Sequence, residues 1–228
     1  MTTDKKLIVF GAGGHGKVVA DIALRAGLAV SGFVDDHAIP GASVGLPWPV
    51  LGDREWLCAQ PRSVYQVALG IGDNYVRLSV ANFLHSKKID VSTIISPFAI
   101  VSPFVQVGTG TVIMSGAVVN AMANIGEGVI VNTGAVVEHD VKVGNYSHLS
   151  PNSTLGGGAK VGEFAHIALG AIVLPLLSIG SRSVLGAGSV ATRSIPANVI
   201  AFGVPARIQP TSCGGQEVVP IQAGAGSG

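Results

Sequence analysis

Aliphatic residues recur at every sixth position through the middle of the chain, from Val107 to Ala191, without a skipped step. The position four residues after each is small or β-branched, with Leu177 and Ile195 as the larger exceptions. A period of six fits neither an α-helix nor a flat strand with alternating sides. It predicts a coil of short strands, about three to each turn of eighteen residues, in which the aliphatic side chains fill a prism-shaped core and the small ones fit tight corners.

A coarser period supports this coil. At every eighteenth position the aliphatic residue is followed by a glycine: Gly108, Gly126, Gly144, Gly162 and Gly180. One corner of the prism therefore stacks glycine on glycine, and we expect a turn there that needs the permissive φ of glycine. A low-complexity segment or an ordinary β-sandwich is the alternative, but the spacing of sandwich strands drifts and this register does not slip.

The residues before the coil alternate between strand and helix patterns. Strands are predicted over 7–10, 30–34 and 64–69, and helices over 17–26 and 75–87, which together describe a small parallel α/β unit. Ser-Pro pairs at 96–97 and 102–103 mark the entry to the coil, and Pro196 marks its exit. We predict an α/β domain over residues 1–92, a coil over 93–208 and a disordered tail over 209–228.

The turn between the first predicted strand and helix has the spacing of a diphosphate-binding loop. Residues 11–16 read GAGGHG, and Asp35 and Asp36 end the next strand. Such a loop offers backbone N–H groups at a helix N-terminus to a diphosphate, and the carboxylates can bind sugar or base groups. The alternative is a plain turn whose glycines only ease packing. Hydride transfer with a nicotinamide cofactor is disfavoured, because the second half of the required sheet is missing.

The amino-acid composition limits which kinds of partner the protein is expected to bind. Lys and Arg number 14 against 13 Asp and Glu, without a basic run, so nucleic acid is not expected as a partner. Mean hydropathy is +0.53, but glycine or polar residues interrupt every apolar stretch before the roughly 18 residues that a membrane span needs. We expect the excess of apolar residues to be buried between subunits. Two cysteines, Cys58 and Cys213, and an N-terminus unlike a signal peptide predict a cytoplasmic protein.

Three of the six histidines fall in the coil. His139 follows the inward Val137 by two positions, so it should be exposed, and the carboxylates of Glu138 and Asp140 flank it. Neighbouring negative charge stabilises the imidazolium and makes the ring a better base. His148 and His166 are eighteen residues apart and should stack. Surface histidines or a zinc site are the alternatives, but spacings of nine and eighteen lack the close histidine pair of zinc-binding β-helix hydratases, so we expect no metal.

These motifs together resemble a known family. The segments GAGGHGKVV, IGDN with Arg77, VNTGAVVEHD, VGNYSHLSP and AFGVPARI resemble bacterial hexapeptide-repeat nucleotide-sugar acetyltransferases of the sialic-acid O-acetyltransferase type. That group includes N-acetyltransferases that act on UDP- or GDP-linked 4-amino-4,6-dideoxy sugars. The resemblance covers residues 6–208 and implies a small Rossmann-like parallel α/β domain followed by a left-handed parallel β-helix.

The resemblance also implies roles for single residues. His139 matches the catalytic base, and Asp140 matches the acidic neighbour that tunes it, although some members have Glu there. The nucleotide sugar is expected at Gly13, Gly14, His15, Asp35, Asp36 and Gly72. Contacts with acetyl-CoA are expected at His148, Leu169 and Ala187, with the pantetheine arm lying between neighbouring subunits of a homotrimer.

The implied reaction transfers the acetyl group of acetyl-CoA directly to the 4-amino group of a nucleotide-linked sugar. Neither cysteine lies near His139 in sequence, so an acyl-enzyme intermediate is disfavoured. O-acetylation of a sialic acid or similar sugar and transfer of a longer acyl group remain as alternatives. A trimeric scaffold without catalytic activity is a third. The residues do not distinguish UDP from GDP.

Overall fold

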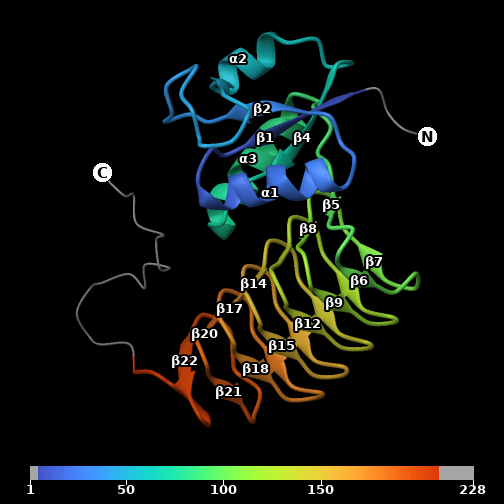
Figure 1. Cartoon of the computed structure of the whole chain (residues 1–228). Helices are drawn as coiled ribbons and strands as arrows, with labels where there is room; N and C mark the ends of the chain where they lie inside the picture. Colours follow the sequence, from blue (N-terminus) through green and yellow to red (C-terminus); the bar gives the residue numbers. More distant parts are fainter. Residues whose placement is uncertain (1–4, 211–228) are drawn as a thin grey trace.

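The computed structural model describes residues 5–210, in which a small α/β unit sits at one end of a long β-helix (Figure 1). Most of the predicted tail, Cys213 included, lies outside the described residues. Within residues 5–210, no helix combines the length and the apolar character that crossing a membrane requires.

The α/β unit is built on a parallel sheet of four strands in the order β3-β2-β1-β4. These strands are β1 (Lys6–Phe10), β2 (Val30–Val34), β3 (Val50–Gly52) and β4 (Tyr65–Leu69). The side chains of β1 alternate between two cores, one against α1 (Gly14–Arg25) and the other against α2 (Arg54–Ala59) and α3 (Asn74–Ser86). A parallel sheet with apolar residues on both faces needs this double cover. The sequence pattern had not predicted β3 and α2.

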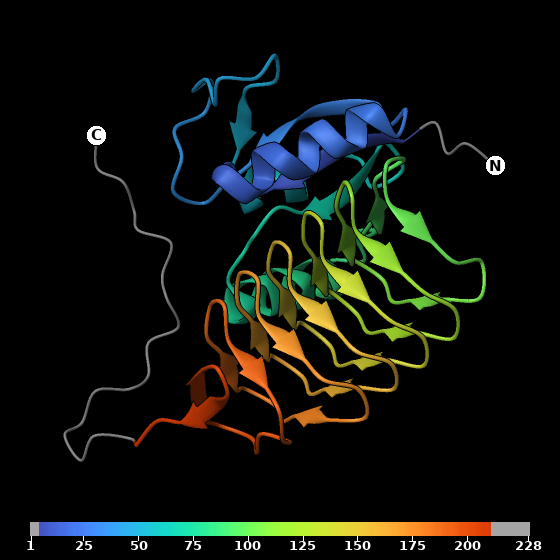
Figure 2. The same ribbon diagram turned by 60° about the horizontal axis from the view of Figure 1, so that its bottom comes forward.

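The rest of the described chain forms the predicted left-handed parallel β-helix, whose strands make three flat faces (Figure 2). The face next to the α/β unit, here the junction face, comprises β5 (Ile94–Ile95), β8 (Val112–Ile113), β11 (Ile130–Val131), β14 (His148–Leu149), β17 (His166–Ile167), β20 (Val184–Leu185), β22 (Ile200–Gly203) and the antiparallel β23 (Ala206–Ile208). The second, the apolar face, comprises β6 (Ile100–Val101), β9 (Val118–Val119), β12 (Val136–Val137), β15 (Thr154–Leu155), β18 (Ile172–Val173) and β21 (Val190–Ala191). The third, the polar face, comprises β7 (Gln106–Val107), β10 (Asn124–Ile125), β13 (Lys142–Val143), β16 (Lys160–Val161) and β19 (Ser178–Ile179).

The six-residue pattern fills the core as predicted. Every aliphatic position from Ile113 to Ala191 is buried, and Val107 packs against the same core from the first turn. Residues eighteen apart pair across neighbouring turns, as His148 does with His166 and Lys142 with Lys160. The prediction of a coil with an aliphatic interior is confirmed.

The predicted reason for the glycine ladder is wrong. Its members do not have the positive φ that was expected; the positive φ falls two positions later, as at Gly110 and Tyr146. The ladder glycines instead allow close approach between turns. A Cβ on Gly108 would lie 2.5 Å from the carbonyl carbon of Gly126, and one on Gly180 would lie 2.3 Å from the backbone nitrogen of Ala197. The corner is too narrow for any side chain at these positions.

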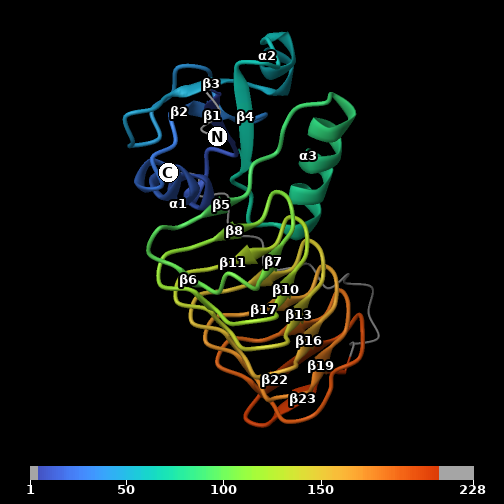
Figure 3. The same ribbon diagram turned by 90° about the vertical axis from the view of Figure 1, so that its right-hand side faces the viewer.

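The outward positions give each face its own chemistry. On the polar face the strands present Gln106, Asn124, Lys142, Lys160 and Ser178. On the apolar face they present Ile100, Val118, Val136, Thr154, Ile172 and Val190. The top of the junction face is covered, since Ile94, Val112 and Ile130 pack with α1 in one buried cluster. Five of the six outward residues of the apolar face are aliphatic, and the described chain leaves them partly or wholly exposed. The neighbouring polar face is seen in Figure 3, where β10, β13, β16 and β19 follow one another along the coil.

Arg77, at the start of α3, fastens the α/β unit to the β-helix. It is 1% exposed, and its guanidinium donates hydrogen bonds to both parts of the chain. The acceptors are the carbonyls of Ile71 (3.0 Å), Gly72 (2.9 Å), Gly128 (2.7 Å) and Tyr146 (3.0 Å) and the side chain of Asn74 (2.7 Å). Burial lowers the pKa of Arg77 to about 10. The charge is therefore retained at neutral pH and is balanced by carbonyl dipoles.

We expect Arg77→Met to lower the free energy of unfolding by about 3 kcal/mol, because several buried carbonyls lose their only strong donor. Arg182→Met is the matched control, since Arg182 is exposed and its guanidinium lies 5.8 Å from the centre of the Phe164 ring. The free energy of unfolding of this control should fall by no more than about 1 kcal/mol. Denaturant unfolding at one fixed protein concentration measures both, and equal losses would contradict the role given to Arg77.

Candidate active site

Two classes of glycine shape the loop between β1 and α1. Gly11 has a φ of 108°, and a Cβ on Gly16 would lie 1.9 Å from the carbonyl oxygen of Gly11. Packing within the chain therefore requires both residues. Gly13 and Gly14 differ, because nothing lies within 4 Å of a Cβ at either position. The loop leaves this space open at the N-terminus of α1.

A second open glycine lies beside the first two. Gly72 follows β4, which pairs with β1 in parallel, so both turns leave the same edge of the sheet. A Cβ on Gly72 would also meet nothing within 4 Å. Ligands of open parallel sheets bind outside the carboxyl ends of the strands, where helix N-termini favour anions. Gly13, Gly14 and Gly72 therefore lie at the same edge of the sheet, each with open space at its Cβ position. Their contact with a diphosphate stays a prediction.

The two aspartates after β2 both form polar contacts with other residues of the chain. Asp35 accepts hydrogen bonds from the backbone of Ala12 (2.8 Å) and His37 (2.9 Å), which ties it to the glycine loop. Asp36 forms an ion pair with Arg54, whose hydrogen bond lowers the pKa of Asp36. Their direct contact with a nucleotide sugar stays a prediction. In the chain itself Asp35 holds the glycine loop, and Asp36 fixes Arg54 at the start of α2.

Histidines from both parts of the chain meet below the glycine loop. The ring of His15, in α1, lies 6.5 Å from that of His148, and His148 stacks on His166 at 5.0 Å. Burial lowers the pKa of His15 to about 4, and the charge of Arg77 adds to this. Burial also lowers the pKa of His148 well below its ordinary value, and that of His166 less far. All three rings are neutral at pH 7.

Two polar side chains that the sequence analysis missed complete this cluster. The side-chain amide of Asn132 donates to Nε2 of His148 (3.0 Å), and the hydroxyl of Ser150 bonds with Nε2 of His166 (2.7 Å). Both residues follow a junction-face strand directly, a position where side chains point outward, and this register could have indicated them. Nε2 of His15 is buried and has no partner among the described residues.

The three residues predicted to contact acetyl-CoA do not have the same surroundings. His148 is half-buried on the junction face, against His15. Leu169 and Ala187 are exposed and stack one turn apart on the corner between the junction and apolar faces. This corner presents a surface along which an extended ligand could lie.

His139 and Asp140 form a pair at the corner between the apolar and polar faces. Nδ1 of His139 donates to Oδ2 of Asp140 (2.8 Å), and each side chain is 64% exposed. This hydrogen bond and the charge of Asp140 raise the pKa of His139, and Glu138 adds a smaller effect. Asp140 has a left-handed backbone, with φ of 61°, a conformation that Asp tolerates well. With Nδ1 protonated, Nε2 is left as the acceptor.

Gly157 borders this free nitrogen from the next turn. A Cβ at Gly157 would lie 2.6 Å from Nε2 of His139, so only glycine leaves the ring its place. The N–H of Gly158 donates to the carbonyl of His139 (2.9 Å). The N–H of Gly157, in contrast, has no backbone acceptor among the described residues. A free acceptor and a free donor therefore lie side by side.

The two halves of the predicted site lie on opposite sides of one chain. His15 and the glycine loop are over the junction face, and His139 is on the corner between the other two faces. In a triangular prism this corner is opposite the junction face, and the aliphatic core lies between them. A single chain does not bring His139 to the glycine loop.

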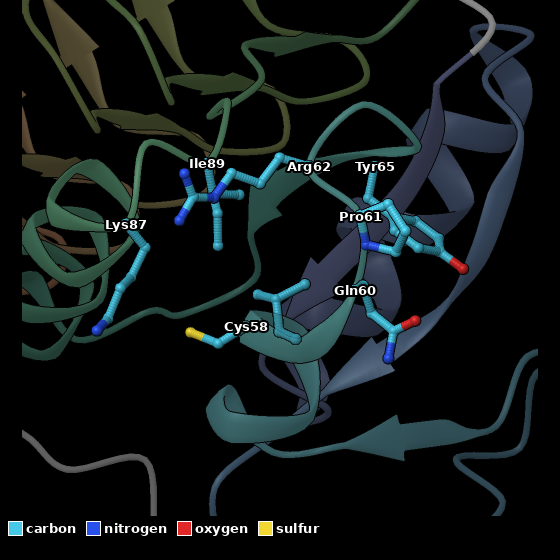
Figure 4. Close-up of a pocket in the computed structure, with 8 residues that line it drawn as sticks. Cys58, Gln60, Pro61, Arg62, Tyr65, Lys87 and Ile89 are labelled. Atoms are coloured by element: carbon cyan, nitrogen blue, oxygen red, sulfur yellow. The ribbon is translucent and has the colours of Figure 1, made fainter.

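A pocket of about 230 Å³ lies elsewhere, at the outer end of the α/β unit (Figure 4). Cys58, Arg62 and Lys87 are among the residues that line it, and it shares none with the predicted site. Within residues 5–210, no group of three or more histidine, cysteine or carboxylate side chains is arranged to hold a metal ion.

Comparisons with known proteins agree with this architecture. A family model for the PglD N-terminal domain matches residues 6–84, and one for bacterial transferase hexapeptide repeats matches residues 122–157. The structure of PerB from Caulobacter crescentus with CoA and GDP-perosamine superposes with a TM-score of 0.85 at 38% identity, over 90% of this chain and 97% of that chain. The chain belongs to the hexapeptide-repeat sugar N-acetyltransferases. The family resemblance expected from the sequence is confirmed.

Two further relatives support this membership. The acetyltransferase domain of PglB from Neisseria gonorrhoeae, solved with acetyl coenzyme A, superposes with a TM-score of 0.85 at 34% identity, over 90% of this chain and all of that chain (100%). UDP-N-acetylbacillosamine N-acetyltransferase of Bacillus subtilis is 41% identical over 116 residues, which are 46% of this chain. The chain aligns with 18% to 50% of the length of the curated relatives it matches.

The neutral histidine cluster predicts that stability falls in mild acid. The unfolded histidines take up protons near a pKa of about 6.5, whereas the folded ones do so only at lower pH, so protonation favours the unfolded state. The melting temperature should fall as the pH is lowered from 7 towards 5. His148→Asn should reduce this fall, and His85→Asn, at an exposed position on α3, should leave it unchanged. If the melting temperature fell with pH by the same amount in both variants, the histidine cluster would not be the cause of the fall.

Proposed function

We propose that the protein transfers the acetyl group of acetyl-CoA to the 4-amino group of a nucleotide-linked 4-amino-4,6-dideoxy sugar. The observation that carries this proposal is the His139–Asp140 pair, whose free Nε2 lies beside the backbone of Gly157. The family supplies the substrate class, since its members include PerB, solved with CoA and GDP-perosamine, and a UDP-N-acetylbacillosamine N-acetyltransferase. PerB has also been solved with one histidine replaced by asparagine or alanine.

The nucleotide sugar binds at the open space beside Gly13, Gly14 and Gly72. Its diphosphate faces the N-terminus of α1, where the backbone N–H groups and the helix dipole favour negative charge. His15 follows Gly14 at the start of α1, and its buried Nε2, which has no partner among the described residues, bonds with the sugar once the ring turns towards the ligand. Asp35 holds the loop in shape for this contact through its hydrogen bond with the backbone of Ala12.

The complete site forms between two subunits of a homotrimer. The apolar face supplies the contact surface, because five of its six outward residues are aliphatic whereas the polar face carries lysines. Such packing brings the His139 corner of one subunit towards the neighbour's glycine loop. Acetyl-CoA lies between subunits, with Leu169 and Ala187 along its path.

His139 acts as the general base. The neutral sugar amine attacks the thioester carbonyl, and a C–N bond forms while Nε2 of His139 takes the proton from nitrogen. The negative charge on the carbonyl oxygen is stabilised by the N–H of Gly157, the free backbone donor next to Nε2. The C–S bond then breaks, and the imidazolium returns the proton to the leaving thiolate. Asp140 stabilises the imidazolium between these steps.

Sugar O-acetylation is the second candidate, since the same base can activate a hydroxyl. Transfer of a longer acyl group and a scaffold without activity are further alternatives, but a scaffold has no need of the His139–Asp140 pair. We also propose that the protein acts in the cytoplasm, where acetyl-CoA is available. Incubation with acetyl-CoA, UDP- and GDP-linked amino sugars and a thiol reagent tests the reaction directly.

His139→Ala should lower kcat by about 10² to 10⁴, the usual contribution of a general base. The substituted position is exposed and fills no core volume, so the trimer and the binding of acetyl-CoA should persist. Steady-state kinetics with sedimentation and calorimetry measures all three. A variant that kept most of its kcat with every amino sugar would rule out His139 as the base.

Asp140→Asn should lower kcat less than His139→Ala does, and it should change the pH–rate profile. Asp140 raises the pKa of His139, and the base acts only when neutral, so activity is lost as the pH falls through that pKa. Removing the charge lowers the pKa and should move the acidic limb of the pH–rate profile to lower pH. Asn also tolerates the left-handed backbone at this position. An unmoved acidic limb would show that Asp140 does not tune the base.

Mixing two inactive variants tests the site between subunits. His139→Ala removes the base, and Gly14→Leu adds a side chain beside the loop at a position where a Cβ meets no other residue of the described chain. In mixed trimers the intact halves meet at one site of three, so random equal mixing should restore about one quarter of wild-type activity. Refolding the variants together and separately makes the comparison. No recovery in trimers shown to be mixed would place the whole site within one chain.

A further inference from the structure

Glu138 is a charged residue on a face that is otherwise neutral. The outward positions on and directly after the strands of the apolar face are Ile100, Ser102, Val118, Asn120, Val136, Glu138, Thr154, Gly156, Ile172, Leu174, Val190 and Thr192. Among these described positions, Glu138 alone ionises. Its side chain is already half-buried before any partner covers the face.

Within the described part of the chain, the carboxylate of Glu138 has a single hydrogen-bond partner, which is neutral. Asn120, one turn earlier, donates its side-chain amide to Oε2 of Glu138 (3.0 Å). Among the ion pairs of residues 5–210, none includes Glu138. Subunit packing against this face would remove water from the carboxylate, and a carboxylate without water needs a cation or further donors. Oε1 is the oxygen left for such a partner.

The position of Glu138 indicates where that cation comes from. It directly precedes His139, and its charge adds to the field that favours protonation of the ring. His139 and Asp140 are the titratable groups beside it, since the neighbouring turns present Asn120 and Gly156 at its register. A cation bound at Oε1 would therefore lie close to the reacting centre.

We propose that Glu138 is a specificity-determining residue that binds the acceptor amine in its ammonium form and so selects amines over hydroxyls. This proposal rests on the proposed function and names what that site recognises. An alkyl ammonium is a cation of the required size, whereas a sugar hydroxyl is neutral and gains much less from a nearby carboxylate. The preference for N-acetylation over O-acetylation then comes from binding, because His139 can serve either acceptor.

The protons balance in this scheme. The bound ammonium first loses one proton to solvent and becomes the nucleophilic amine. During attack the nitrogen loses a second proton to Nε2 of His139, which passes it to the thiolate as the C–S bond breaks. The net reaction of ammonium and acetyl-CoA gives amide, free CoA thiol and one proton.

The test compares Glu138→Gln with the wild type. Gln keeps the size of the side chain and an oxygen for Asn120 but lacks the charge. We expect about a tenfold higher Kd and KM for the amino sugar at pH 7, with kcat within about threefold and the KM for acetyl-CoA unchanged. The effect should shrink as the pH rises and the free amine becomes neutral. Calorimetry with the 4-hydroxy counterpart of the sugar should show equal affinity for both proteins.

Glu163→Gln, at an exposed glutamate between the polar and junction faces, is the matched control and should change none of these values. A Glu138→Gln protein that dissociates into monomers would show that a cation of the neighbouring subunit pairs with Glu138, and would overturn the proposal. So would an unchanged Kd for the amino sugar, or a change that is the same at every pH. If the wild type acetylated no amino sugar, the proposed function would fail and this inference with it.

Discussion

Each turn of the β-helix hydrogen-bonds to the next in register, so residues eighteen positions apart must stack. Every other feature of the coil depends on this constraint. It places His148 on His166, Asn120 beside Glu138 and Gly157 next to His139, although nothing in local propensity would pair them. It also converts a linear sequence into three faces with different chemistry. The aliphatic core holds the register, because a slip by one residue would turn every inward side chain outward.

The register positions groups only within the coil, and the α/β unit needs a separate attachment. Arg77 supplies it by donating to carbonyls of both parts. A guanidinium satisfied by neutral carbonyls leaves its positive charge uncancelled, and that charge helps to lower the pKa of His15, His148 and His166. One buried residue thus attaches the α/β unit over the junction face, and its charge adds to the burial that keeps the nearby histidines neutral. Neutral rings can accept hydrogen bonds, which protonated rings cannot.

Sequence reasoning succeeded where structure follows from spacing along the chain. The period of six predicted the coil, and adjacency predicted the contact of His139 with Asp140. It failed where the cause is a contact across turns or between the two parts. The glycine ladder has its glycines because the next turn approaches closely, a fact that φ preferences do not reveal. The hydrogen bond from Asn132 to His148 joins two neighbouring turns of the coil, and the one from Arg77 to Gly128 depends on how the two parts meet, which no local pattern encodes.

The division of the site between opposite sides of one chain sets a condition on activity. The core between His139 and the glycine loop is packed with buried aliphatic side chains, so no modest motion within the chain can join them. In the homotrimer proposed above, a neighbouring subunit supplies the missing half. The apolar face, which we propose as the contact surface of that trimer, carries Glu138 and borders His139. Assembly through this face would remove water from the base and its acceptor at the step that brings them together, and would strengthen the electrostatic interactions on which the proposed transfer depends.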